Sequence, residues 1–146
     1  MKLFLISGRA GTGKGETAKA ILKASSLTLR EESFAFGVKE TAKFMDWNGI
    51  KDDAGRKLLQ GVGKVGRQYD PDLWVSQTHN RMQESYRPDG YIISDWRFES
   101  EVLFLQQTCK YDIIKIRVES TDREMLRGKE TYNDESEISL PSGLEF

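Results

Sequence analysis

The stretch Leu3-Phe4-Leu5-Ile6-Ser7-Gly8-Arg9-Ala10-Gly11-Thr12-Gly13-Lys14-Gly15 determines how the rest of the chain is interpreted. An apolar run of strand length leads into a loop with glycines at its first, fourth and sixth positions, and a lysine follows where the helical run 16–22 begins. Glycine accepts positive φ and lets the backbone approach a ligand closely, so successive N–H groups can converge on phosphate oxygens. The N-terminus of the helix and the ammonium group of Lys14 add positive charge at the same place. The pattern predicts a phosphate-binding loop, because a glycine-rich turn with a chance lysine would lack the flanking strand and helix.

The position that normally binds Mg²⁺ in such a loop has an unusual residue in this chain. Ser or Thr normally follows the lysine and binds Mg²⁺ through its hydroxyl, whereas here Gly15 and Glu16 precede Thr17. Adenylate-kinase-like enzymes also have glycine after the lysine, with a hydroxyl residue next, so the run resembles a nucleoside monophosphate kinase more than a GTPase. Glu16 in the hydroxyl position leaves the metal contact open. The residues expected to bind the phosphates of ATP are Gly8, Arg9, Ala10, Gly11, Thr12, Gly13, Lys14, Gly15, Glu16 and Thr17.

Composition limits the classes of protein to which the chain can belong. A length of 146 residues suggests one domain with one sizeable core. The 22 basic and 23 acidic residues nearly balance, so no basic excess indicates a nucleic-acid partner. The single cysteine cannot form an internal disulfide, and the opening apolar run is too short for a signal sequence or a membrane span. We expect a cytoplasmic protein without nucleic-acid or membrane partners.

Strand and helix patterns alternate along the chain, which predicts an α/β fold with a mostly parallel sheet. Strands are expected at residues 3–7, 33–36, 91–95 and 112–118, and helices at residues 16–22, 38–47, 54–59, 73–86 and 99–108. Residues 27–32 are interpreted as a surface connection. Residues 61–67 are interpreted as a flexible basic loop, whose glycines let the backbone shift when a ligand binds.

A carboxylate and an arginine follow the predicted strand 91–95. Asp95 is expected at the carboxyl end of this strand, the edge where open α/β sheets bind ligands. It can hold Mg²⁺ there, directly or through water, together with substrate phosphates; the alternative is that it caps the next helix. The planar fork of Arg97 suits phosphate oxygens, and its alternative is a surface ion pair with Glu99 or Glu101. We expect Asp95 and Arg97 to take part in catalysis.

Taken together, these segments resemble the phage-type deoxynucleoside monophosphate kinases over most of the chain. The order and spacing of the motifs carry the resemblance, because only the first of them is specific alone. The motifs are residues 8–14, Phe34-Ala35-Phe36-Gly37-Val38-Lys39, Leu59-Gln60-Gly61-Val62-Gly63 with Arg67, Asp72-Leu73-Trp74-Val75, Ser94-Asp95-Trp96-Arg97-Phe98 with Glu101, and Ser136-Glu137. The resemblance implies a P-loop NTPase-like three-layer fold in a single domain, residues 1–146. It also implies transfer of the γ-phosphoryl group of ATP to a (deoxy)nucleoside monophosphate with Mg²⁺, in the host cytoplasm if the protein is phage-encoded.

The resemblance also assigns roles to individual residues. It implies a helical acceptor-binding insertion at residues 37–89, and a short lid-like segment at residues 119–137. Its acceptor-binding residues are Lys39, Arg67, Trp74 and Arg97, and its lid arginines, which neutralise charge on the transferring phosphoryl group, are Arg123 and Arg127. The residues alone leave alternatives open. Lys39 also fits a solvated helix position, Trp74 fits core packing better than base stacking, and the two lid arginines fit a charged helical face.

The carboxyl end of the chain differs from the family pattern. The family has a further strand and helix after Ser136-Glu137, and this chain ends at Phe146. We therefore expect a sheet edge that is either open or covered by a second copy in a homodimer. Two other functions compete with the leading one: a kinase for another small phosphorylated metabolite, and a non-catalytic nucleotide-binding or regulatory module. Glu16 and the short carboxyl end make the non-catalytic module plausible.

Overall fold

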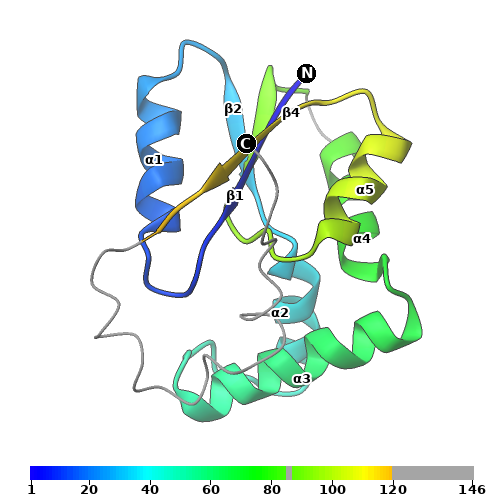
Figure 1. Cartoon of the computed structure of the whole chain (residues 1–146). Helices are drawn as coiled ribbons and strands as arrows, with labels where there is room; N and C mark the ends of the chain where they lie inside the picture. The colour runs from blue at the N-terminus through cyan, green and yellow to red at the C-terminus, as the bar shows by residue number, and fades with distance from the viewer. Residues whose placement is uncertain (85–86, 120–146) are drawn as a thin grey trace.

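The computed structural model describes residues 1–84 and 87–119 (Figure 1). These residues form a four-stranded sheet in the order β2-β3-β1-β4, in which all neighbouring strands are parallel. The strands are β1 (Lys2–Ser7), β2 (Leu29–Glu32), β3 (Gly90–Ile93) and β4 (Asp112–Arg117), and the helices are α1 (Lys14–Ala24), α2 (Ala35–Phe44), α3 (Asp53–Tyr69), α4 (Leu73–Glu84) and α5 (Glu99–Thr108). The predicted α/β class with a parallel sheet is confirmed.

Helices cover both faces of the sheet. Successive side chains of a strand point to opposite faces, and β1 shows this directly. Leu3 and Leu5 are fully buried in a cluster that includes residues of α4 and α5, whereas Ile6 is buried in a second cluster with Ala18 of α1. Figure 1 shows α1 on one side of the sheet and α4 and α5 on the other. The sheet therefore forms the middle layer of three.

The helices α2, α3 and α4 occupy the segment between β2 and β3. Figure 1 shows α2 and α3 beyond one end of the sheet, the end toward which α2 departs from β2. Because parallel strands share their carboxyl ends, α2 and α3 lie next to the loops that follow β1 and β3. This arrangement places the helical segment beside the predicted phosphate-binding loop.

The prediction of a flexible loop at residues 61–67 is wrong, because these residues form the second half of α3. Their glycines serve close packing against Trp74. The indole Nε1 of Trp74 donates to the carbonyl of Gly63 at 3.0 Å. A Cβ atom would lie 2.2 Å from the indole ring at Gly66 and 2.9 Å from it at Gly37 of α2. The absence of side chains at these positions lets α2 and α3 pack directly on the ring, and this packing stabilises a glycine-rich helix.

The second strand was predicted at the wrong position. Residues 35 and 36 begin α2, and the strand is Leu29–Glu32, which was expected to be a surface connection. This strand lies at the edge of the sheet and pairs only with β3 among the described strands. Three of its four side chains are charged, and Arg30 pairs with Glu32 at 2.9 Å and lies over the Tyr91 ring at 5.0 Å from its centroid. Charged residues are common on edge strands, where they oppose aggregation, so the strand carries no apolar signal.

The other predicted elements are confirmed to within a few residues. These are β1, α1, α2, α4 over its described part, β3, α5 and β4. Arg123, Arg127, the lid-like segment from residue 120 onward and Ser136-Glu137 lie outside the described residues. None of the described helices combines the length and the apolar character needed to cross a membrane.

Candidate functional site

The loop after β1 has the backbone conformation that its glycines predict. Gly8, Gly11 and Gly13 have φ angles of 148°, 78° and 93°, all in the region that favours glycine. A Cβ atom at Gly8 would lie 2.4 Å from the carbonyl oxygen of Val118, so the end of β4 packs directly on the loop. Within the loop, Thr12 donates to the carbonyl of Arg9 through its hydroxyl at 2.8 Å. The loop is therefore compact and closely held against the sheet.

Lys14 is the first residue of α1, and its ammonium group folds back over the loop. Nζ donates to the carbonyl of Gly8 at 2.5 Å and to that of Arg9 at 2.8 Å. The N–H groups in the first turn of a helix make no intrahelical hydrogen bond and attract anions. Glu16 pairs with Lys19 at 3.0 Å, and both side chains are largely exposed to solvent. This geometry is compatible with the predicted phosphate-binding loop, and the Glu16 carboxylate lies on the exposed surface of α1.

The sheet topology places this loop beside the segment that follows β3. The strand β1 lies between β3 and β4. The helix α1, which follows β1, and the helix α5, which follows β3, cover opposite faces of the sheet (Figure 1). Parallel sheets bind ligands at the carboxyl ends of strands whose connections leave to opposite faces. Residues 8–13 and 94–98 therefore border one crevice.

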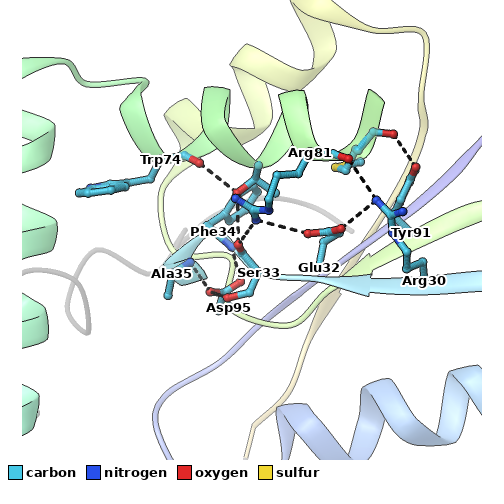
Figure 2. A network of polar contacts seen from close by, with 11 residues as sticks. Arg30, Glu32, Ser33, Phe34, Ala35, Trp74, Arg81, Tyr91 and Asp95 are labelled. Carbon is cyan, nitrogen blue, oxygen red and sulfur yellow. Dashed lines mark hydrogen bonds and ion pairs between the residues drawn. The ribbon is translucent and has the colours of Figure 1, made fainter. Parts of the chain in front are cut away.

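Asp95 connects this crevice to the start of α2 (Figure 2). Its carboxylate accepts hydrogen bonds from the hydroxyl of Ser33 at 2.7 Å and from the backbone N–H groups of Phe34 at 3.0 Å and Ala35 at 2.8 Å. The sequence suggested a cap on the next helix as the alternative to a metal ligand. The carboxylate does cap a helix, but the helix is α2, which begins 60 residues earlier in the chain. A contact with Mg²⁺ through water stays a prediction.

We expect Asp95→Asn to lower stability by about 1 to 3 kcal/mol, because the amide NH₂ group would face backbone N–H donors and leave one unsatisfied. Thermal unfolding followed by circular dichroism measures this loss. The matched control is Asp112→Asn, which removes an exposed ion pair with Lys2 and should change stability little.

If Asp95 also reaches a metal, the Mg²⁺ concentration for half-maximal turnover should rise in the Asp95 variant. An Asp95 variant as stable as the wild type would contradict the capping role.

A cavity of about 820 Å³ opens beside the loop. The four residues predicted to bind the acceptor, Lys39, Arg67, Trp74 and Arg97, all line it, together with Ala10 of the phosphate-binding loop. They come from three helices and from the segment after β3. Lys39 is half-buried on the first half of α2. The structure thus brings the predicted acceptor residues together, next to the predicted donor site.

Trp74 contributes to this cavity mainly as a packing residue. Its side chain is only 7% exposed, and its ring is covered by Gly37 and Gly66. This burial favours the interpretation that Trp74 fills the interface between α2, α3 and α4. It holds the face of α3 that carries Arg67 toward the cavity.

The cavity has more positive charge than the sequence predicted. Lys51 and Arg56 also line it. The pKa of Lys51 is lowered by burial first, and then by the charges of Lys39, Arg56 and Arg97, with Asp95 opposing them. Cations gathered around one cavity form a site suited to a polyanion.

The sequence contains a pattern from which some of the cavity-lining residues could have been predicted. The cavity-lining residues of α3 include Arg56, Gln60, Gly63 and Arg67, at positions i, i+4, i+7 and i+11. Such spacing places side chains on one helix face. The interpretation of residues 61–67 as a loop interrupted this pattern and hid it.

Glu101 fixes the segment that carries Arg97. One of its carboxylate oxygens, Oε2, accepts from the backbone N–H groups of Arg97 and Phe98, both at 3.1 Å. The guanidinium of Arg67 stacks on the Phe98 ring with its Cζ 4.5 Å from the centroid. Burial raises the pKa of Glu101 to about 7. The two backbone hydrogen bonds and the charge of Arg67 lower this pKa, and the charge of Asp95 raises it. The Glu101 carboxylate therefore positions both arginines. It holds Arg97 through the backbone N–H of that residue, and it holds Arg67 through the Phe98 ring, over which the Arg67 guanidinium lies.

The raised pKa of Glu101 predicts how stability depends on pH. Between its ordinary value of 4.5 and about 7, the folded protein binds more protons than the unfolded chain. Stability should therefore fall as pH rises through this range, by up to about 3 kcal/mol, and then level off. Glu101→Gln keeps an oxygen acceptor for the two N–H groups and removes the titration. Urea unfolding at pH 5, 6, 7 and 8 should show a flatter profile for the variant, with its gain over the wild type largest at pH 8. Parallel profiles for the two proteins would refute the assignment.

Comparison with known proteins adds no family assignment. No protein-family model matches the chain, and no curated protein matches it. Among residues 1–84 and 87–119, no group of three or more His, Cys, Asp or Glu side chains is arranged to hold a metal ion. The geometry of the loop and the cavity therefore carries the functional argument.

Proposed function

We propose that the protein transfers the γ-phosphoryl group of ATP to a (deoxy)nucleoside monophosphate, giving the diphosphate and ADP, on a P-loop NTPase-like fold. The phosphates of ATP bind at residues 8–17, against the N-terminus of α1 and Lys14. The acceptor monophosphate binds in the adjoining cavity at Lys39, Arg67 and Arg97. The helices α2 to α4 form the acceptor-binding unit in this proposal.

One observation carries the proposal: Ala10 of the loop and the three acceptor cations line the same cavity. Two phosphate groups bound at these places would approach each other, as transfer between them requires. The cavity volume of about 820 Å³ lies within the range usual for small-molecule sites, about 300 to 1,000 Å³. A site built only to hold one nucleotide would not need a second group of cations beside the loop.

The reaction requires no nucleophilic side chain. An oxygen of the acceptor phosphate attacks the γ-phosphorus, the bond to the β–γ bridging oxygen breaks, and ADP leaves. Lys14 and Arg97 neutralise charge during this step, and Arg123 and Arg127 stay predicted partners. Mg²⁺ would supply further neutralisation of the phosphates. The chain offers Asp95 as a ligand through water, and most ligands of the ion would be phosphate oxygens and water.

A coupled assay of ADP release tests the proposal. ATP and Mg²⁺ are held constant while deoxynucleoside and nucleoside monophosphates are added one at a time, and the rate without acceptor is the control. We expect at least one monophosphate to raise ADP formation well above the control rate. ATP binding is measured in parallel by calorimetry. If ATP binds and no acceptor raises the rate, the protein is a nucleotide-binding module and the proposal is wrong.

A further inference from the structure

Phe36 lies at the start of α2, lines the cavity and is 45% exposed. The guanidinium of Arg81, from α4, lies over its ring with the Cζ atom 4.2 Å from the centroid. Arg81 is held in place by its Nη2 atom, which lies 3.0 Å from the carbonyl of Ser33, 3.2 Å from the hydroxyl of Thr78 and 3.3 Å from the carboxylate of Glu32 (Figure 2). The ring therefore has a fixed cation over one face.

This arrangement gives the cavity a flat surface on which a ligand can stack. A guanidinium over one face of a phenyl ring is a stabilising contact that fixes the orientation of the ring. The side chain remains nearly half exposed, so it keeps a surface on which a second flat group can stack. Aromatic heterocycles gain stacking energy there, whereas a phosphorylated sugar without a ring system of this kind does not.

The spacing along α2 relates this surface to the cation cluster. Lys39 follows Phe36 by three residues, so the two side chains lie on one helix face with Cβ atoms roughly 5 to 6 Å apart. Both residues line the cavity. A ligand whose phosphate is bound near Lys39 can reach Phe36 with a group a few ångströms from that phosphate. The base of a nucleotide meets this requirement.

We infer that Phe36, supported by Arg81, is the stacking platform for the nucleobase of the acceptor. The substrate class is then a nucleoside monophosphate, and other phosphorylated metabolites without an aromatic base are excluded. This inference rests on the proposed function only for the position of the acceptor phosphate. It assigns the role in base stacking to Phe36 in place of the buried Trp74.

Isothermal titration calorimetry without ATP tests the platform independently of turnover. The probes are the deoxynucleoside monophosphates and 2-deoxyribose 5-phosphate, which has the same phosphate and sugar without the base. Phe36→Leu should weaken binding of the best nucleotide about 5- to 100-fold and leave binding of the sugar phosphate unchanged. Phe36→Tyr keeps the ring and should bind as the wild type does. Phe44→Leu is the matched control on the same helix, because Phe44 is 91% exposed and does not line the cavity.

Each outcome decides the inference. A wild type that binds the sugar phosphate as tightly as the nucleotides would overturn it, as would a Phe36→Leu variant that weakens both probes equally. Loss of nucleotide binding in Phe36→Tyr as large as in Phe36→Leu would also overturn it. If the predicted pattern appears but no ADP is released in the coupled assay, the platform stands and the proposed kinase activity fails. If ADP is released and the Michaelis constant for the nucleotide is unchanged in Phe36→Leu, the kinase activity stands and the platform fails.

Discussion

Lys14→Met should lower the turnover number about 10²- to 10³-fold, the largest effect that we expect from a single substitution. The ammonium group neutralises charge that develops on the transferring phosphoryl group, and a preorganised donor of this kind contributes most in the transition state. Methionine keeps much of the length of the side chain and removes the charge. The variant should fold, because Lys14 is only half-buried and its hydrogen bonds to the carbonyls of Gly8 and Arg9 lie within its own loop.

Steady-state kinetics with saturating ATP and monophosphate measure this effect, with circular dichroism as the check on folding. Lys19→Met is the matched control, because Lys19 lies on the same helix, is exposed and forms an ion pair with the equally exposed Glu16. The control should retain wild-type turnover. A folded Lys14 variant with wild-type turnover would exclude Lys14 from the catalytic step.

Arg67→Ala should reduce kcat/KM for the monophosphate about 30- to 1,000-fold, which corresponds to roughly 2 to 4 kcal/mol of productive binding. The guanidinium lies over the Phe98 ring, with its Cζ atom 4.5 Å from the centroid, and its planar fork suits a bidentate contact with a phosphate group. The Michaelis constant for ATP should barely change, because Arg67 comes from α3 whereas the donor site is the loop before α1. Arg67→Lys should recover only part of the loss, since an ammonium group cannot reproduce the planar fork.

Kinetics with each substrate varied in turn distinguish the two sites. Lys64→Ala, also on α3, exposed and absent from the cavity lining, is the control and should behave as the wild type does. A defect of Arg67→Ala that appears in the ATP constant, with the monophosphate constant unchanged, would move Arg67 to the donor side. The proposed separation of donor and acceptor sites would then be wrong.

The parts of the fold that could be predicted from sequence are those with a strong local pattern. The strand, loop and helix from residue 2 to residue 24 are specified by an apolar run, positive-φ glycines and a lysine at the helix start. The strand β3 is a continuous apolar run, as expected for a buried parallel strand. In each case the residues that determine the structure lie within the element itself or next to it.

The errors in the predicted secondary structure occur where a residue distant in the sequence determines the local conformation. Residues 61–67 have the composition of a loop, and they are helical because the ring of Trp74 packs where side chains would otherwise lie. Residues 29–32 have no apolar pattern, and they form a strand because the edge of β3 is available and Arg30 pairs with Glu32 and stacks on Tyr91. Neither contact can be derived from local propensity.

The candidate site divides in the same way. Lys39, Arg67 and Arg97 were predicted from motifs, and they line one cavity as expected. Phe36 and Arg81 were not predicted to interact, because their contact depends on how α4 packs against the start of α2. The sequence suggested that Asp95 could cap a helix, but only the three-dimensional structure shows that the capped helix is α2.

The packing around Trp74 limits how this sequence can diverge. A Cβ atom at position 66 would lie 2.2 Å from the indole, and one at position 37 would lie 2.2 Å from the Gln77 side chain and 2.9 Å from the indole. Even alanine at position 66 requires the ring to move, and loss of the ring would leave a void between two glycine faces. A substitution at any one of positions 37, 66 and 74 is therefore tolerated only if the residues at the other two positions change to fit it. In a population of diverging sequences these three sites should exchange residues as a coupled set, whereas the exposed positions of the same helices vary independently.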